Sequence, residues 1–351
     1  MTDRRGAVQR AEGGAVAGGC DESVARPPAA AHHHVLPSGR ALVASRLVPA
    51  RPEQTRIYRN HHLDSTRWDG VVPRAGDIVV TTAYKAGTTW TQRILAALIL
   101  GPVRVDDLGG VSPWIDARFH GPLEPVLASI DAQSHRRFLK SHLAADGLRY
   151  LDDTTYVVVG RDTRDVFMSL WNHYSGYTDL TYDRMNDAER PGPEFPRCPA
   201  GPRDLWARWI TEGWFEWEPD GWPFWSHHHH ISSWWEHRDL PNVIFVHYVD
   251  LLADTEGEMR RLAALCDIDV AESDWPALVD LVRLDAMREE ARAVEDAGAH
   301  YFDGGADRFY YKGTNGRWRD VLTDDDLVLY ERAAANLDPD LRRWLEAGRP
   351  R

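Results

Sequence analysis

The chain has 351 residues, of which 43% are apolar and 27% charged, a composition typical of an enzyme long enough to bury a large core. Its formal net charge of -13 argues against a general nucleic-acid binder, but it leaves room for a local basic pocket. The longest apolar run, ILAALILG from Ile94, is too short for a transmembrane segment, and three widely spaced cysteines indicate a reduced, cytoplasmic setting.

The predicted elements begin after an irregular first segment. Residues 1–50 are rich in Ala, Gly, Arg and Pro without periodicity, which predicts a flexible tail, and residues 51–351 are predicted to form a single domain. Short apolar segments predict strands at 77–82, 137–140, 155–160 and 242–248. Helices are predicted at 88–100, from Thr163 behind an Asp162 cap, in the segment TEGEMRRLAALCDI and behind Thr323.

Continuous apolar strands that alternate with helices indicate a parallel sheet covered on both faces, a three-layer α/β/α fold. Ligands of such sheets bind beyond the carboxyl ends of the strands. Lys85, Lys140, His142 and Arg161 all follow a predicted strand end. We therefore expect these four side chains to converge at one edge of the sheet.

The first candidate motif is KAGTTW, which joins the first strand to the first helix. Gly87 allows the backbone to approach an anion, and the amides and hydroxyls of Thr88 and Thr89 can donate to phosphate oxygens at the helix start. Lys85 precedes the glycine, so the nucleoside-triphosphate pattern G-x-x-x-x-G-K-[ST] is absent. An ordinary helix cap is the alternative interpretation.

Three further motifs carry groups suited to anion binding or proton transfer. In FLKSHL, Lys140 and His142 point the same way if the strand continues, and a neutral imidazole there could accept a proton. In VVVGRDTRDVFMS, Arg161 and Ser169 could bind a phosphate, with an ordinary ion pair as the alternative. In YYKGTNGRW, Lys312 and two glycines indicate either an anion-binding loop or a plain turn.

Lysine is rare in this chain, since only Lys85, Lys140 and Lys312 contribute to the 41 basic residues. Arginine replaces lysine at most surface positions without cost. It cannot do so where a compact charge or a removable proton is needed. All three lysines fall within the motifs above, which supports a functional interpretation of those motifs.

Together and in this order, the four motifs resemble those of the sulfotransferase family that uses 3′-phosphoadenosine 5′-phosphosulfate (PAPS). KAGTTW is similar to the end of that family's T-Y-P-K-S-G-T-T-W, and LKSHL is similar to K-T-H-L. RDTRDVFMS resembles R-N-P-x-D-x-x-x-S, and YKGTNGRW resembles R-K-G-x-x-G-D-W. The resemblance runs from Asp77 to Trp318 and implies a P-loop-like form of the α/β/α fold.

The resemblance also implies roles for single residues. His142 would be the general base for in-line attack by a hydroxyl, with Lys85 and Lys140 steadying the transferred group, and no metal would be needed. The 5′ end of PAPS would be held by Lys85, Ala86, Gly87, Thr88, Thr89 and Trp90, with Trp90 stacking on adenine. The 3′-phosphate would be held by Arg161, Ser169, Lys312 and Gly313, with Tyr248 near the adenine.

This chain departs from the family pattern at several positions. Tyr311 stands where the family has arginine, which predicts either a weaker 3′-phosphate site or a shift of that role to Arg317. Ala83-Tyr84 replaces Tyr-Pro, and the T-S-F segment near the adenine becomes VRLDAM, residues 282–287. The family's dimer signature is not kept at RDVLTDDDLV, so the oligomeric state stays open.

The expected acceptor is a small apolar phenol, alcohol or glycolipid. A P-loop nucleotide kinase and an inactive nucleotide-binding module are the alternatives. The run His227–His230 could suggest a metal site, but a packed or solvated segment is favoured, because consecutive histidines cannot all face one ion. Eight of the 15 tryptophans lie in residues 206–235, where we expect core packing and some walls of an acceptor pocket.

Overall fold

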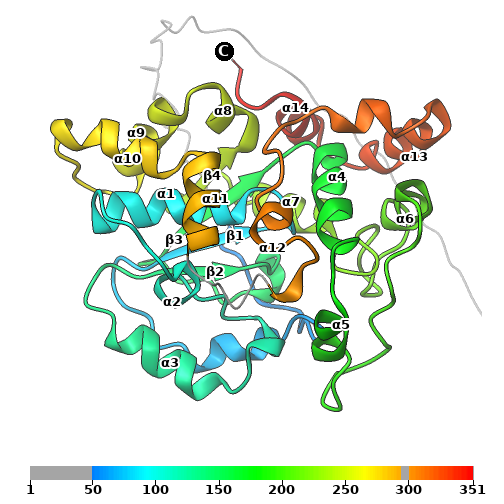
Figure 1. Cartoon of the computed structure of the whole chain (residues 1–351), viewed down its shortest axis with the longest axis horizontal. Coiled ribbons are helices and arrows are strands. Elements are labelled where there is room, and N and C mark those ends of the chain that lie inside the picture. Colours follow the sequence, from blue (N-terminus) through cyan, green and yellow to red (C-terminus); the bar gives the residue numbers. More distant parts are fainter. Residues whose placement is uncertain (1–49, 294–299, 351) are drawn as a thin grey trace, which may run out of the picture. The chain divides into compact units, whose positions relative to one another are not determined.

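A parallel sheet of four strands forms the centre of the computed structural model (Figure 1). The structure describes residues 50–293 and 300–350, so nearly all of the tail predicted at 1–50 lies outside the described residues. Residues 48–351 form one compact unit. The strand order is β2-β1-β3-β4, with β1 at Ile78–Thr82, β2 at Phe138–Ser141, β3 at Thr155–Gly160 and β4 at Val243–His247.

Both faces of the sheet are buried, as the apolar strands predict. Along β3, Val157 and Val159 face one core, whereas Tyr156 and Val158 face the other, since neighbouring side chains of a strand point to opposite faces. The first core is completed by α1 (Thr88–Leu100), α9 (Thr255–Leu265) and α10 (Trp275–Leu281). The second is completed by α4 (Thr163–Tyr174), α7 (His227–Trp235) and α14 (Pro339–Ala347), which confirms the three-layer fold.

The remaining helices lie in the connections. They are α2 (Leu108–Val111), α3 (Leu123–Ala132), α5 (Asp179–Met185), α6 (Pro202–Trp209), α8 (Tyr248–Ala253), α11 (Leu284–Ala293), α12 (Gly305–Phe309) and α13 (Asp324–Ala334). No helix within the described ranges is both long enough and apolar enough to cross a membrane.

The capping residues read from the sequence set the helix ends. The side chain of Asp162 accepts a hydrogen bond from the amide of Arg164 and begins α4. Thr323 and Asp326 form a capping box at the start of α13. Several strand boundaries differ from the prediction by one residue, and the fourth strand ends at His247 instead of Tyr248. The ring of His247 accepts from the amide of Val249 and caps α8, a helix that was not predicted.

The tryptophan-rich segment packs in the core. Trp206, Trp209 and Trp234 are among the largest fully buried side chains. The histidine run forms the first turn of α7, where three of its four members are buried: His227, His228 and His230. The groups of His, Cys, Asp and Glu in the described part of the chain include none that could hold a metal ion. The packed-segment interpretation is therefore confirmed for α7.

Candidate active site

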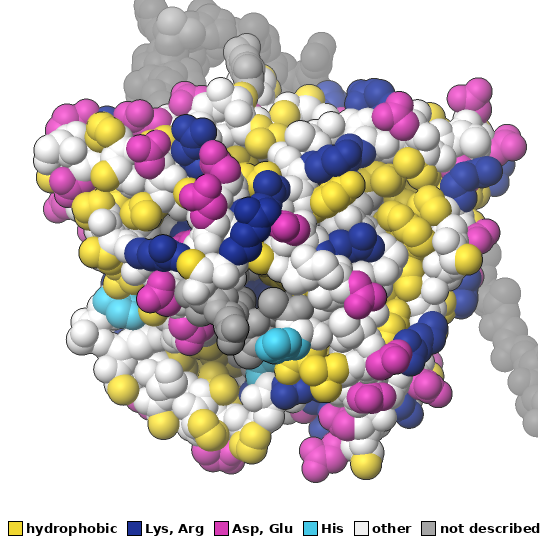
Figure 2. Space-filling model, viewed as in Figure 1, with side chains coloured by type: hydrophobic (Ala, Val, Ile, Leu, Met, Phe, Trp, Pro, Cys, Tyr) yellow, Lys and Arg dark blue, Asp and Glu magenta, His cyan; other side chains and the backbone are white. Residues whose placement is uncertain are grey.

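A cavity of about 970 Å³ lies beyond the carboxyl ends of the strands and is lined by residues of all four motifs. On the face drawn in Figure 2, Lys and Arg side chains are interspersed with Asp and Glu. The basic groups of the four motifs line the cavity. Twelve of the thirteen predicted site residues line it: Lys85, Gly87, Thr88, Thr89, Trp90, Lys140, His142, Arg161, Ser169, Tyr248, Lys312 and Gly313. The exception is Ala86, which is fully buried outside the lining.

The loop between β1 and α1 has an unusual backbone. Lys85 has φ of 65° and Gly87 has φ of 129°, both in the region that side chains with a Cβ avoid. A Cβ on Gly87 would lie 3.0 Å from the Tyr248 ring. The glycine therefore lets the loop pass close to Tyr248, the first residue of α8.

Two of the three lysines that line the cavity, Lys85 and Lys140, lie in surroundings that weaken their protonation. The Lys85 Nζ lies 3.2 Å from Nδ1 of His173. Burial, then the charges of Lys140 and Arg161, lowers the pKa of Lys85 to about 7. Burial lowers the pKa of Lys140 to about 8, and its ammonium lies 4.2 Å from the centre of the Trp114 ring. Both groups can therefore gain or lose a proton close to neutral pH.

His142 is held in one tautomer. Its Nδ1 lies 2.8 Å from the carbonyl oxygen of Thr82, which can only accept, so Nδ1 carries the proton. Nε2 has no hydrogen-bond partner within residues 50–293 and 300–350 and keeps its lone pair. Burial, and next the charge of Lys140, holds the pKa of His142 well below its usual range. The imidazole is therefore neutral at pH 7 and able to accept a proton.

Asp116 supports this arrangement and was missed from the sequence. Its buried carboxylate accepts from the indole N–H groups of Trp114 (2.7 Å) and Trp68 (3.0 Å) and from the amide of His142 (3.1 Å). It thereby fixes the Trp114 ring, whose centre lies 4.7 Å from that of His142. The segment PWIDARF lies outside every recognisable motif, so nothing in the sequence indicated this role.

The second end of the cavity is built around Arg161. Its guanidinium lies 4.0 Å from the centre of the Tyr248 ring and donates to Asn315 Oδ1 (3.0 Å) and the carbonyl of Thr314 (3.1 Å). Asp165 accepts from the amide of Gly316 at 2.6 Å and ties the same loop to α4. These contacts bring the third and fourth motifs together, although about 150 residues separate them in the sequence.

Arg317 joins this end of the cavity. Its Nε is buried and has no partner among the described residues, and its side chain lines the cavity. Burial, followed by the charge of Arg161, lowers its pKa. The Arg317 guanidinium lies 5.2 Å from the centre of the Tyr311 ring. An arginine therefore reaches this end of the cavity even though Tyr311 replaces the family arginine.

Comparison with known proteins identifies the family. A model of the sulfotransferase domain matches residues 75–335. The chain belongs to the sulfotransferase family. A glycolipid sulfotransferase of Mycobacterium tuberculosis is 33% identical over 310 residues, which cover 84% of this chain and 94% of that protein. Human sulfotransferase 1C2 is 24% identical over 257 residues, covering 70% and 78% of the two chains.

Solved structures support the fold of this sulfotransferase. A mouse sulfotransferase complexed with PAP has a TM-score of 0.59 at 17% identity, and covers 80% of this chain and 92% of that one. Retinol dehydratase in complex with retinol and PAP has a TM-score of 0.58 at 19% identity, with coverages of 78% and 85%. At these identities the likeness shows a shared fold.

Family membership favours a sulfuryl-transferring enzyme over the kinase and the inactive module. The residue that could have imitated a magnesium-binding acid is Asp162, in the segment VVVGRD. Its carboxylate caps α4 and forms an ion pair with Arg164 at 2.5 Å. It is therefore engaged in holding the helix start.

The segment that replaces the family's T-S-F, residues 282–287, lies beside Trp90 of the first motif. Trp90 donates its indole N–H to the carbonyl of Val282 at 2.9 Å. Arg283, Leu284 and Met287 line the cavity next to it. The VRLDAM segment therefore stays at the cavity wall despite its changed sequence.

The expectation that tryptophans of residues 206–235 form walls of the acceptor pocket is wrong. None of these eight side chains, all within the described ranges, is in the cavity lining. Trp225 packs behind it, with its ring centre 5.3 Å from that of His142 and 5.0 Å from that of Tyr84. The apolar walls come from elsewhere in the chain: Tyr84, Trp114, Phe119, Tyr177, Met185, Phe302 and Phe309.

Proposed function

We propose that this sulfotransferase moves the sulfuryl group of PAPS to a hydroxyl of a small apolar or lipidic acceptor. The observation that carries the proposal is the convergence of the four motifs on one cavity with basic groups and aromatic walls. The likeness to a glycolipid sulfotransferase supports a lipidic acceptor. Aromatic and aliphatic walls favour the burial of an apolar acceptor body.

The nucleotide would extend from the first motif to the fourth. Gly87 and the two threonines that follow would hold the 5′-phosphosulfate through amides and hydroxyls at the start of α1. Arg161, Ser169 and the Lys312-Gly313 turn would hold the 3′-phosphate, with Arg317 as an additional cation. Trp90 and Tyr248, whose ring centres lie 5.3 Å apart, would contact the adenine.

His142 and the two lysines would carry the chemistry. Nε2 of His142 accepts the proton of the acceptor hydroxyl, whose oxygen attacks sulfur in line with the bond that breaks. The bridging oxygen leaves with the nucleotide phosphate, and Lys85 stabilises it by donating a hydrogen bond or a proton. The anionic donor raises the pKa of Lys85 above its value of about 7, so the lysine is protonated when the donor is bound. Lys140 stabilises the charge on the sulfuryl oxygens.

A substitution of the base tests this function. In the His142→Ala variant we expect labelled-sulfate transfer to a panel of phenols, alcohols and glycolipids to fall by at least about a hundredfold, since general-base catalysis is lost. Binding of adenosine 3′,5′-bisphosphate (PAP), measured by calorimetry, should stay within about twofold of the wild-type value.

The matched control is His135→Ala, a half-buried histidine whose ring contacts the carbonyl of Arg136 outside the cavity lining. This variant should keep both transfer and binding. Unchanged turnover in His142→Ala would remove His142 as the base. A wild-type protein that binds ATP with magnesium in preference to PAP, or that transfers sulfate to no acceptor, would overturn the proposed function itself.

A further inference from the structure

Two neighbouring histidines near the start of the domain lie at the acceptor side of the cavity. His61 and His62 are 0% and 1% exposed, and His62 is part of the cavity lining. The ring centre of His62 lies 6.4 Å from that of Tyr84 and 5.9 Å from that of Trp225. The same two aromatic rings contact His142, at 5.5 and 5.3 Å. His62 and the proposed base therefore border one small region of the cavity.

Hydrogen bonds fix which ring nitrogens of the pair carry protons. Nε2 of His61 lies 2.9 Å from the carbonyl oxygen of Pro223, which can only accept, so this nitrogen holds the proton. Nδ1 of a neutral His61 is then an acceptor. It lies against Nδ1 of His62, which must donate to it. His62 therefore keeps a lone pair on Nε2.

Both rings are neutral at physiological pH. Burial, followed by the neighbouring His62, holds the pKa of His61 well below its usual range. Burial and the charge of Arg118 lower the pKa of His62 to about 3. The tautomers set by the Pro223 carbonyl are therefore the ones present at neutral pH.

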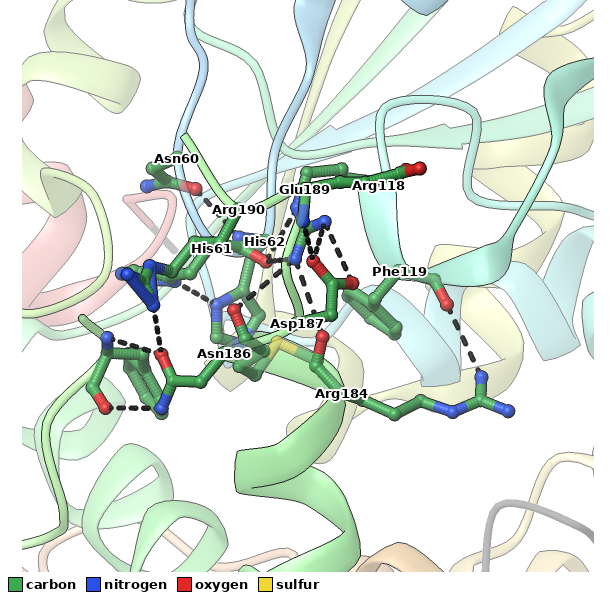
Figure 3. A network of polar contacts seen from close by, with 12 residues as sticks. Asn60, His61, His62, Arg118, Phe119, Arg184, Asn186, Asp187, Glu189 and Arg190 are labelled. Carbon is green, nitrogen blue, oxygen red and sulfur yellow. Dashed lines mark hydrogen bonds and ion pairs between the residues drawn. The ribbon is translucent and has the colours of Figure 1, made fainter. Parts of the chain in front are cut away.

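The backbone beneath the pair is held rigidly (Figure 3). The side chain of Asn60 accepts from the amide of His62 at 2.9 Å. Arg118 donates to the carbonyl of His61 at 3.1 Å and forms a two-oxygen ion pair with Asp187 at 2.9 and 3.0 Å. The amide of Arg118 donates to the carbonyl of His62 at 2.8 Å. The backbone of His62 is therefore fixed, and the hydrogen bond between its Nδ1 and Nδ1 of His61 orients the ring.

The lone pair of His62 has no partner in the part of the chain that the structure describes. No hydrogen bond to its Nε2 occurs within residues 50–293 and 300–350, and yet this nitrogen is absent from the fully buried polar atoms that lack a partner. It therefore reaches the cavity space. The hydroxyls of Tyr84 and Tyr177 bond to each other at 2.8 Å, and neither donates to His62 among the described residues. A desolvated acceptor without a donor is costly, so a ligand group fits here.

We propose that Nε2 of His62 accepts a hydrogen bond from a second hydroxyl of the acceptor, so that the substrate class is a polyhydroxylated headgroup on an apolar body. This inference rests on the proposed sulfuryl transfer. His142 would deprotonate one hydroxyl of the acceptor, while His62 would accept a hydrogen bond from a neighbouring hydroxyl of the same acceptor. An acceptor with a single hydroxyl leaves the His62 lone pair unpaired, and a site built for a hydroxyl discriminates against an analogue that lacks it.

The test compares two acceptors with the same tail, octyl β-D-glucopyranoside and 1-octanol. For the wild-type enzyme we expect kcat/KM to favour the glucoside by about tenfold or more. The His62→Phe variant should lose about tenfold on the glucoside and less than about twofold on octanol. The His62→Gln variant, whose amide oxygen can still accept, should retain most of the preference. PAP binding by calorimetry should be unchanged in both variants and reports that they are folded.

A measurement on the wild-type chain does not depend on the folding of any variant. In ¹⁵N-histidine NMR spectra of the PAP complex, Nε2 of His62 should appear as an unprotonated nitrogen and shift toward lower frequency when octyl glucoside is added. A protonated Nε2, or equal losses on both acceptors in His62→Phe, overturns the inference. So does a wild-type enzyme that sulfates octanol at least as well as the glucoside, or that sulfates phenols and neither octyl compound. Those outcomes leave the sulfotransferase proposal standing, because PAP binding and transfer to a phenol are measured separately.

Discussion

At the scale of single residues, two substitutions in the fourth motif explain how this end of the cavity keeps its positive charge. The family motif places arginine before the lysine and aspartate before the tryptophan, whereas this chain has Tyr311 and Arg317 at those positions. Arg317 reaches the cavity beside Arg161, and its Nε is buried without a partner among the described residues. Two neighbouring guanidinium groups, one of which has an Nε without a partner among the described residues, favour an anion between them.

We predict that Arg317 supplies the discrimination in favour of the 3′-phosphate. The Arg317→Met variant should weaken PAP binding by about tenfold or more while changing the binding of adenosine 5′-phosphate by less than about twofold. Calorimetry with both nucleotides checks this. The exchange variant Tyr311→Arg/Arg317→Asp, which restores the family pattern, should recover most of the lost PAP affinity.

The Arg319→Met variant is a matched control, since that arginine stacks on the outside of Trp318 at 4.4 Å and is absent from the cavity lining. It should bind both nucleotides as the wild type does. If Arg317→Met weakens the binding of PAP and of adenosine 5′-phosphate by the same factor, Arg317 does not bind the 3′-phosphate.

At the scale of elements, the loop from β1 to α1 requires glycine at position 87 for two reasons, its backbone conformation and the close approach of neighbouring side chains. Gly87 combines φ of 129° with a position where a Cβ would meet Tyr248 at 3.0 Å and Val159 at 3.4 Å. Gly192 also has positive φ, 76°, but a Cβ there would meet nothing within 4 Å. Substitution of Gly192 therefore tests the effect of positive φ alone, whereas substitution of Gly87 tests positive φ together with a close contact.

We predict that Gly87→Ala and Gly192→Ala each lower the free energy of unfolding by about 1–2 kcal/mol, because alanine disfavours positive φ. Only Gly87→Ala should weaken PAP binding, by about tenfold or more. The added Cβ forces the loop away from Tyr248, and the loop amides then no longer lie where they can donate to the phosphate. Urea unfolding and calorimetry measure the two effects. A Gly87→Ala protein with wild-type PAP affinity would show that this loop does not hold the nucleotide.

At the scale of the whole molecule, several imidazoles are buried in a neutral form. Burial is the first cause that lowers the pKa of His62 and His230 to about 3 and that of His120 and His247 to about 4. In the unfolded chain these imidazoles have the ordinary histidine pKa of 6.5. Below that pH the unfolded state binds more protons than the native state, so stability falls as pH falls.

We therefore predict that the free energy of unfolding decreases between about pH 6.5 and pH 5, by more than the 1.4 kcal/mol per pH unit that one imidazole contributes. Three buried carboxyl groups oppose this trend, because burial raises the pKa of Glu218 to about 8 and also raises those of Asp116 and Asp165, but the buried imidazoles outnumber them. Urea unfolding at a series of pH values checks the slope. A flat profile would mean that the buried histidines become protonated without unfolding.

Local patterns predicted the elements well, and long-range contacts account for what they missed. Apolar runs located all four strands, and Asp162 and Thr323 marked their helix starts, because these signals depend on neighbouring residues. Asp116 and His62 were missed as site residues, since Asp116 contacts the distant His142 and the tautomer of His62 depends, through His61, on the distant carbonyl of Pro223. The tryptophan walls were wrongly predicted because composition does not say which side of a core a ring faces.

The sequence by itself determined the family, the order of the strands along the chain and the residues of the four motifs, because spacing and residue type carry that information. It left open whether Arg317 replaces the missing arginine and which groups face the acceptor. The tertiary structure adds that Arg317 reaches the cavity and shows which described residues line it, because both depend on contacts between distant parts of the chain. Pairing β3 beside β1 and β4 brings Arg161 to the fourth motif, and the fixed tautomers of His61 and His142 exist only where the carbonyls of Pro223 and Thr82 reach the two rings.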